Sequence, residues 1–212
     1  MSFPVGNAVI SQGFTLVVNK AFGANDLVLY NTTRTMTNFV KTIMGTIATS
    51  VWPEFTISFG KKDYSRMQKI HRLSLFFSSL IAVLISFTLI IFGEYIYTIW
   101  TSGAIKFNFN LMAVFLLVLV VNNLWYTSSV TMMATNNHSK LGILYMISSF
   151  FSLLLAYFLI PIWHSLIVTA LCLLIVDAVL SAYTIRNSLL LTQDSFSQII
   201  KSLKNIKLKQ IF

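Results

Sequence analysis

The chain has few charged residues and very few acidic ones. Of its 212 residues only 10% are charged, six are Asp or Glu, and 56% are hydrophobic. A folded protein cannot cover itself with polar surface from this composition, so a lipid bilayer has to replace much of the water-facing exterior. The low charge therefore argues against an ordinary soluble enzyme and predicts an integral membrane protein.

Cysteine and histidine are also scarce, which narrows the chemistry that the chain can perform. The single cysteine, Cys172, excludes an intrachain disulfide and a cysteine-based metal cluster, and we interpret it as a buried structural thiol. The three histidines are expected in loops, without the spacing of metal ligands. Neither a nucleotide-binding glycine loop nor a nucleophile elbow nor a pair of catalytic carboxylates occurs in the sequence. We therefore predict no metal, no cofactor and no enzymatic activity.

Long apolar runs predict an all-α protein with about six transmembrane helices. Three charge-free runs are each long enough to cross a hydrocarbon core, which needs about 20 residues. A fourth run is interrupted only by Asp177, and two more polar segments precede the others. The predicted spans cover residues 3–22, 27–52, 73–100, 107–135, 141–163 and 165–185. We assign residues 1–186 to this six-helix bundle and residues 187–212 to a basic cytoplasmic tail.

The positions of the positive charges indicate the orientation. A formal charge of +9 would suggest a nucleic-acid partner in a soluble protein, but here the charge follows the membrane topology. A dense basic loop at 61–72 separates the second and third spans, and the positive-inside rule assigns it to the cytoplasm. Alternation then places eleven basic residues inside and two, Lys20 and Lys106, outside. The sequence thus predicts a multi-pass protein of the cell inner membrane with both termini cytoplasmic and no nucleic-acid partner.

One face of the second predicted span carries polar and cationic residues. Asn31, Arg34, Asn38, Lys41 and Gly45 recur at spacings of 3, 4, 3 and 4, so they share one side of a helix. A cation at mid-bilayer costs roughly 2.5–3.5 kcal/mol on insertion scales, so this side must face protein or water. In one interpretation Arg34 and Lys41, with Asn31 and Asn38, line an aqueous cavity that attracts an anionic group such as a phosphate. In the other, the cations belong to an intramembrane ion pair.

Asp177, near mid-depth in the sixth predicted span, is the candidate acid for such a pair, or alternatively a proton or cation site that couples transport to a gradient. Two further polar groups either line the same cavity or form interhelical hydrogen bonds. They are Asn7, Ser11, Gln12, Thr15 and Asn19 in the first span, and Asn122 and Asn123 in the fourth. The segment 199–212 is either an amphipathic stretch on an anionic leaflet or a solvated basic tail.

Short motifs occur in an order that resembles one family. They are Phe3 to Asn7, Gln12-Gly13, Arg34-Thr35, Val51 to Phe55, His71 to Leu73, Phe92 to Glu94, Trp100-Thr101, Leu124 to Ser129 and Ala134 to His138. Along nearly the whole chain this order resembles the C-terminal half of an O-antigen flippase. That flippase family is the polysaccharide-transporter branch of the multidrug/oligosaccharidyl-lipid/polysaccharide exporter superfamily.

The resemblance implies a transporter of two parallel six-helix bundles around a central cavity that opens alternately to each side, of which this chain supplies one. It implies a substrate, lipid-linked oligosaccharide carried on undecaprenyl pyrophosphate, whose anionic head group Arg34 and Lys41 receive inside the cavity. The implied partners are this substrate, membrane lipids, and either a missing N-terminal six-helix half or a second copy of the chain.

Other functions stay open at this point. One is half of a cation-coupled multidrug antiporter of the same superfamily, although a cationic stripe suits cationic substrates poorly. Another is a membrane-embedded polysaccharide polymerase or transferase, which would usually need a large outer loop bearing catalytic residues. A third is an inactive truncated remnant of a transporter.

Overall fold

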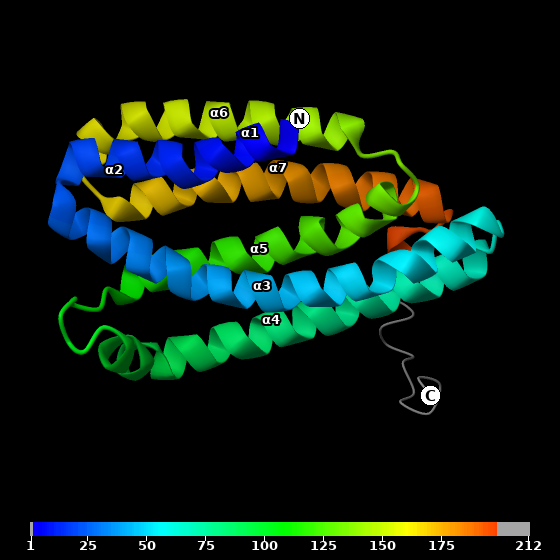
Figure 1. Ribbon diagram of the computed structural model, residues 1–212, viewed down its shortest axis with the longest axis horizontal. Coiled ribbons are helices and arrows are strands. Elements are labelled where there is room, and N and C mark those ends of the chain that lie inside the picture. Colours follow the sequence, from blue (N-terminus) through cyan, green and yellow to red (C-terminus); the bar gives the residue numbers. More distant parts are fainter. Residues whose placement is uncertain (1, 199–212) are drawn as a thin grey trace.

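The structure, a computed structural model, describes residues 2–198 and contains no β-strand in that range (Figure 1). Its helices are α1 (Ser2–Ala8), the π-helical segment η1 (Val9–Gly13), α2 (Phe14–Phe22), α3 (Ala24–Gly60), α4 (Tyr64–Trp100), α5 (Phe109–Ala134), α6 (Ser139–Trp163) and α7 (Leu166–Thr192). The predicted tail at 187–212 therefore begins inside α7, and its segment 199–212 lies outside the described residues.

Local sequence signals set several helix boundaries. Asp63 precedes α4 and its carboxylate accepts a hydrogen bond from the Arg66 backbone N–H at 3.0 Å. Asn108 precedes α5, and its side-chain amide oxygen accepts a hydrogen bond from the Leu111 backbone N–H at 3.0 Å. Gly23 separates α2 from α3 with a φ of 83°, a left-handed value that glycine adopts without steric cost. No such break separates α1, η1 and α2, which form one continuous rod.

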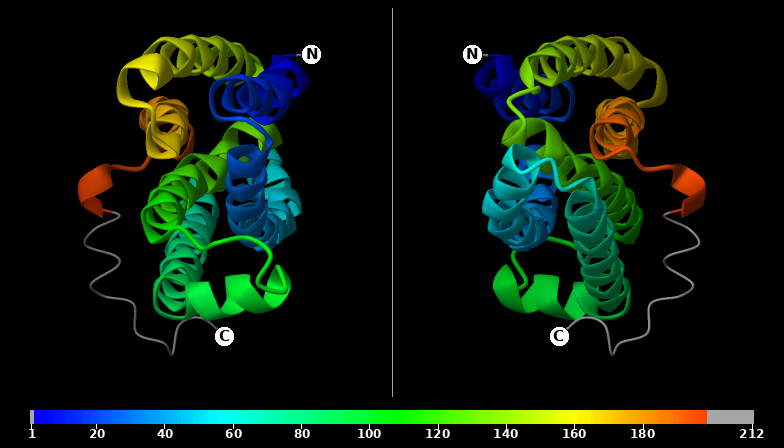
Figure 2. Two further views of the ribbon diagram at one scale, coloured as in Figure 1. Left: turned by 90° about the vertical axis from the view of Figure 1, so that its left-hand side faces the viewer. Right: turned by 90° about the vertical axis from the view of Figure 1, so that its right-hand side faces the viewer.

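The helices form two layers. In one layer α3, α4 and α5 contact one another, and in the other the α1–η1–α2 rod contacts α6, which contacts α7. The extensive contact between α5 and α7 joins the layers, as the end views of Figure 2 show. Near Gly23, α2 contacts α3, whereas α1 contacts α6 instead, so the rod and α3 diverge away from this turn (Figure 1). We call this end of the bundle the Gly23 end and the opposite one the Gly60 end.

Within residues 2–198, four helices are long and apolar enough to cross a membrane: α4, α5, α6 and α7. They overlap the predicted third to sixth spans, with boundaries that differ by one or more residues, which is consistent with an all-α membrane protein. The α1–η1–α2 rod and α3 contain the first two predicted spans, but they are not among these four. The rod is divided into elements of 7, 5 and 9 residues, and both the rod and α3 carry polar residues along one side, which lowers their hydropathy. Length and composition thus support four spans rather than six.

The predicted basic loop at 61–72 is mostly helical. The turn between α3 and α4 is short, and the basic residues from Arg66 onward occupy the first turns of α4. His71, which we expected in a loop, is fully buried, and its ring lies edge-on to that of Phe55 with the centroids 6.5 Å apart. The hydropathy pattern missed this part of α4 because a helix can extend beyond the apolar run that it contains.

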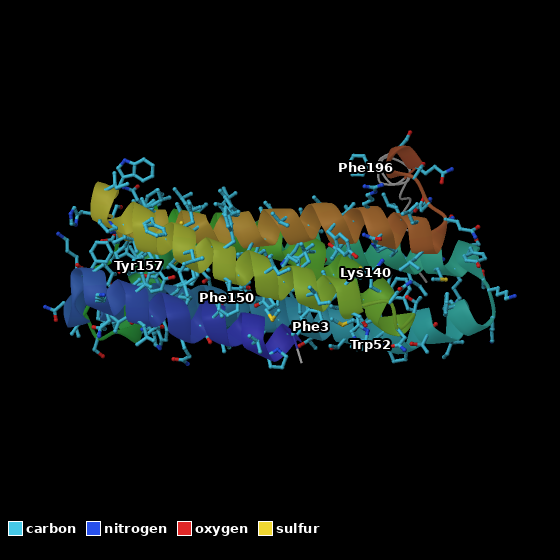
Figure 3. All side chains as sticks on the ribbon, turned by 90° about the horizontal axis from the view of Figure 1, so that it is seen from above. Phe3, Trp52, Lys140, Phe150, Tyr157 and Phe196 are labelled. Atoms are coloured by element: carbon cyan, nitrogen blue, oxygen red, sulfur yellow. The ribbon has the colours of Figure 1, made fainter. Side chains whose placement is uncertain are left out.

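Large apolar side chains cover the outside of α4 and α6. Leu84 and Phe87 on α4, like Phe158 and Ile162 on α6, are each more than half exposed. Figure 3 looks onto α6 and the α1–η1–α2 rod, with Tyr157 labelled near the Gly23 end. Apolar patches of this extent are rare on soluble monomers, whereas lipid tails would cover them at no cost.

The rod packs closely on α6 at Gly6. A β-carbon at this position would lie 2.7 Å from Cδ1 of Tyr145 and 3.4 Å from the Met146 Cα. Gly6→Ala is therefore expected to push α1 away from α6 and to destabilise the protein by about 1–3 kcal/mol, measured as a lower melting temperature in detergent. Gly60→Ala is the matched control, because nothing lies within 4 Å of a β-carbon there. Equal melting temperatures for the two variants would contradict this close packing.

Candidate substrate cavity

A cavity of about 970 Å³ lies where the rod and α3 diverge. The rod and α3 form two of its walls, and α5, α6 and α7 supply the remainder. Its volume is at the upper end of the range of about 300–1,000 Å³ that is usual for small-molecule sites. The charged side chains in the lining are Arg34, Lys41 and Asp177. Two cations and one carboxylate give the wall a formal charge of +1.

Lys41 is the cation of this cavity that makes no direct contact with an anion, although the Asp177 carboxylate attracts it electrostatically. It lies partly buried in the middle of α3 and lines the cavity. Within residues 2–198 no carboxylate oxygen lies within 4.0 Å of its ammonium nitrogen, and its side chain makes no hydrogen bond. An ammonium group removed from bulk water is strongly destabilising unless a counter-charge or water compensates for it. The ammonium is therefore available to an anion that enters the cavity.

Arg34 is held in place by the rod and by its own helix. Its Nη1 donates to the carbonyl oxygens of Ile10 at 3.4 Å and Ser11 at 3.2 Å. Its Nη2 donates to Thr15 Oγ1 at 3.2 Å and to Asn31 Oδ1 at 2.9 Å. All of these acceptors are uncharged, so the guanidinium keeps its full positive charge at the cavity wall. Arg34 thus contributes to the field in the cavity and also ties α3 to the rod.

The carbonyl groups that bind Arg34 belong to η1. A π-helical turn pairs each carbonyl with the N–H five residues ahead, which disturbs the regular α-helical ladder and often marks a functional site. Both Ile10 and Ser11 lie inside η1 (Val9–Gly13), directly opposite the Arg34 guanidinium. The Arg34 guanidinium also lies over the Tyr30 ring, with Cζ 5.4 Å from the centroid. The sequence offered no signal for this π-helical turn.

Asp177 is buried in the wall formed by α7 and is held by two neutral donors on α5. Asn122 Nδ2 and Trp125 Nε1 donate to the same carboxylate oxygen, at 2.8 Å and 2.7 Å. The side chain is 5% exposed and lines the cavity together with Lys41. The distance between them exceeds the 4.0 Å limit of an ion pair, so the direct pair considered from the sequence is not formed in this structure.

The other residues singled out in the sequence divide into two groups. Asn38, Asn7, Ser11, Asn122 and Asn123 line the cavity. Four more do not: Asn31 and Thr15 hold the Arg34 guanidinium, and Gln12 and Asn19 lie elsewhere on the rod. Sequence reasoning missed the aromatic residues of the wall, because isolated aromatics in apolar runs resemble core residues. These are Phe3, Phe115, Trp125, Tyr126 and Tyr145.

No group of three or more His, Cys, Asp or Glu in residues 2–198 could hold a metal ion. Comparisons with protein-family models, with curated proteins and with solved structures give no match to this chain. What the cavity binds has to be inferred from its own side chains.

Proposed function

We propose that this chain is one bundle of a flippase that moves a lipid-linked oligosaccharide across the cytoplasmic membrane, and that its cavity receives the anionic head group. The observation that carries the proposal is the unpaired Lys41 ammonium in a cavity whose wall is net positive. A pyrophosphate would supply a counter-charge in direct contact with Lys41 through charge-assisted hydrogen bonds. Arg34 would add a second, fixed positive charge on the same wall.

The polar part of the wall suits the hydroxyl groups of a sugar. Thr42, Thr46 and Thr49 line the cavity on α3, and each donates its hydroxyl hydrogen to a carbonyl one turn earlier in the helix. Each oxygen therefore still accepts hydrogen bonds from a ligand. Aromatic rings lie nearby on α5 and α6, giving a wall that is both polar and apolar, as binding sites for amphiphilic ligands require.

The same cavity accounts for the low hydropathy of the first two predicted spans. The α1–η1–α2 rod and α3 form the two diverging walls, so Asn7 and Ser11 on the rod and Asn38 and Lys41 on α3 face the cavity rather than lipid. We propose that both cross the membrane, which gives six spans with the basic residues of the Gly60 end in the cytoplasm. A second bundle, either a complementary half or another copy of the chain, would close the cavity and alternate its access.

Half of a cation-coupled multidrug antiporter is the second candidate, and it rests on Asp177. This carboxylate lines the cavity, where it could accept a proton or attract a cationic substrate. Asn122 and Trp125 already donate to it, and Lys41 and Arg34 oppose binding of a cation in the same wall. The balance of charge favours an anionic ligand.

Cysteine accessibility tests the proposal. In a Cys172→Ala background, Thr42→Cys is expected to react with a charged, water-soluble thiol reagent, because Thr42 lines the cavity beside Lys41. Val83→Cys on the outside of α4 is the control, expected to be shielded by lipid. Lipid-linked oligosaccharide is expected to protect position 42, and adding Lys41→Ala is expected to remove that protection. Protection by cationic dyes but not by the oligosaccharide lipid would favour the antiporter.

A further inference from the structure

A second hollow lies on the outside of the bundle near the Gly23 end, between α2 and α6. We call it the Lys20 groove; its volume is about 440 Å³. It is lined by Val17, Lys20, Ala21, Tyr157, Phe158, Ile160 and Pro161. Its wall is almost entirely apolar, and Lys20 is its one charged side chain. The transport mechanism proposed above makes no use of it.

The Lys20 side chain lines the groove and contacts the Tyr157 ring. Its ammonium nitrogen lies 5.6 Å from the centroid of the Tyr157 ring, which orients the cation through a cation–π contact. Among residues 2–198 no carboxylate oxygen lies within 4.0 Å of it. The ammonium is exposed and keeps donors free for an external anion.

The groove lies beside the ends of α2 and α6, which corresponds to the depth of lipid head groups in the six-span arrangement proposed above. Lys20 is in the last turn of α2, and Pro161 is in the last turn of α6, which ends at Trp163. Tyr157 and Trp163 are about half exposed or more, and amphipathic rings near the ends of membrane helices favour the membrane–water interface. The surrounding surface of α6 is apolar and suits acyl chains, as the view in Figure 3 shows around Tyr157.

Pro161 removes one backbone hydrogen-bond donor from α6 at the groove. Proline has no N–H, so it cannot donate to the carbonyl of Tyr157 one turn earlier in α6. A helix carbonyl that lacks this N–H can accept from a ligand hydroxyl, so a lipid that carries both a phosphate and a hydroxyl group suits the groove.

We propose that the Lys20 groove is a binding site for an anionic phospholipid of the phosphatidylglycerol type. The lipid phosphodiester accepts from the Lys20 ammonium, its glycerol hydroxyl donates to the Tyr157 carbonyl, and an acyl chain lies along Phe158 and Val17. The ammonium supplies the preference for an anionic head group, because a basic residue near a membrane surface favours anionic lipid by about fivefold.

Photo-crosslinking to the full chain in vesicles tests this site. Phosphatidylglycerol and phosphatidylcholine carrying the same photoreactive acyl chain are compared, and the crosslinks on residues 17–21 and 157–163 are quantified by peptide mass spectrometry. The wild-type protein is expected to yield about five times more crosslink with phosphatidylglycerol, and Lys20→Gln is expected to bring the two yields close to equal.

Two variants separate a specific site from general attraction of anionic lipid. Lys20→Arg keeps the positive charge and is expected to keep the preference. Lys106→Gln removes an exposed cation at the same end of the bundle, outside the groove, and is expected to leave the preference unchanged. Equal yields from the wild-type protein, an unchanged preference in Lys20→Gln, or an equal loss in Lys106→Gln would each overturn the proposal.

Discussion

Replacing Lys41 with alanine is expected to abolish export of lipid-linked oligosaccharide while the protein stays in the membrane at normal abundance. Its side chain makes no hydrogen bond or direct ion pair within residues 2–198, and Asp177, which it attracts, keeps its hydrogen bonds from Asn122 and Trp125 when the lysine is removed. A hydrogen bond to a charged group contributes about 1.5–3 kcal/mol, so the affinity for the head group is expected to fall about 10- to 150-fold. The measurement is surface polysaccharide in cells that depend on a two-bundle transporter containing this chain.

Two controls accompany this variant. Lys41→Arg keeps the charge and is expected to retain much of the export, whereas Lys106→Ala removes a lysine far from the cavity and is expected to change nothing. Full surface polysaccharide in Lys41→Ala cells would contradict the role assigned to this lysine.

Replacing Arg72 with alanine is expected to lower the stability strongly, because Arg72 joins the start of α4 to the segment after α7. Its Nε and Nη2 donate to the two carboxylate oxygens of Asp194, at 2.8 Å and 2.6 Å. The Asp194 side chain is covered in part by Arg72 itself, so the variant would remove its charge partner and open the carboxylate to water. From the loss of two charge-assisted hydrogen bonds we expect a loss of about 1.5–3 kcal/mol and a fall in melting temperature of roughly 3–12 °C in detergent.

The same helix provides the matched control. Arg66 pairs with Glu54, but both side chains are about half exposed, so Arg66→Ala is expected to change the melting temperature little. A similar fall in both variants would show that the loss comes from removing any arginine here rather than from the covered pair.

The contact with Arg72 also predicts a dependence on pH. Burial raises the pKa of Asp194, but the Arg72 guanidinium and the Ser195 backbone N–H outweigh it and hold the pKa below its usual 3.8. A carboxyl group with a lowered pKa in the folded state stabilises the protein above its unfolded pKa. That contribution is lost as the pH falls through the folded value. The gap in melting temperature between wild type and Arg72→Ala is therefore expected to narrow below about pH 4; a constant gap would contradict this.

The sequence predicted where helices would form better than where they would end. The apolar runs correctly indicated the four membrane-length helices, because their hydropathy alone identifies them. The sequence analysis did not predict that α4 starts at Tyr64 or that α7 continues to Thr192. These extensions are amphipathic or polar, and they are stabilised by contacts such as Arg72 with Asp194, which are 122 residues apart in the chain. No local pattern carries that information.

Part of the cavity wall could be predicted from the sequence, because the spacing of residues along one helix is a local pattern. Helical spacing placed Arg34, Asn38 and Lys41 on one side of α3, and the structure places all three in the cavity wall. Asn31 shares their spacing but is turned to the Arg34 guanidinium instead. The spacing of residues on one helix cannot reveal which neighbour each side chain will meet. The role of these residues in binding substrate stays a prediction.

The acceptors of Arg34 in η1 have a consequence for how the protein tolerates sequence change. Since the oxygen atoms at positions 10 and 11 belong to the main chain, exchanging Ile10 or Ser11 for another residue type does not delete them. Substitutions at these two positions would thus leave the hydrogen bonds between the α1–η1–α2 rod and Arg34 of α3 largely intact. Substitution at position 34 itself is the direct way to break it.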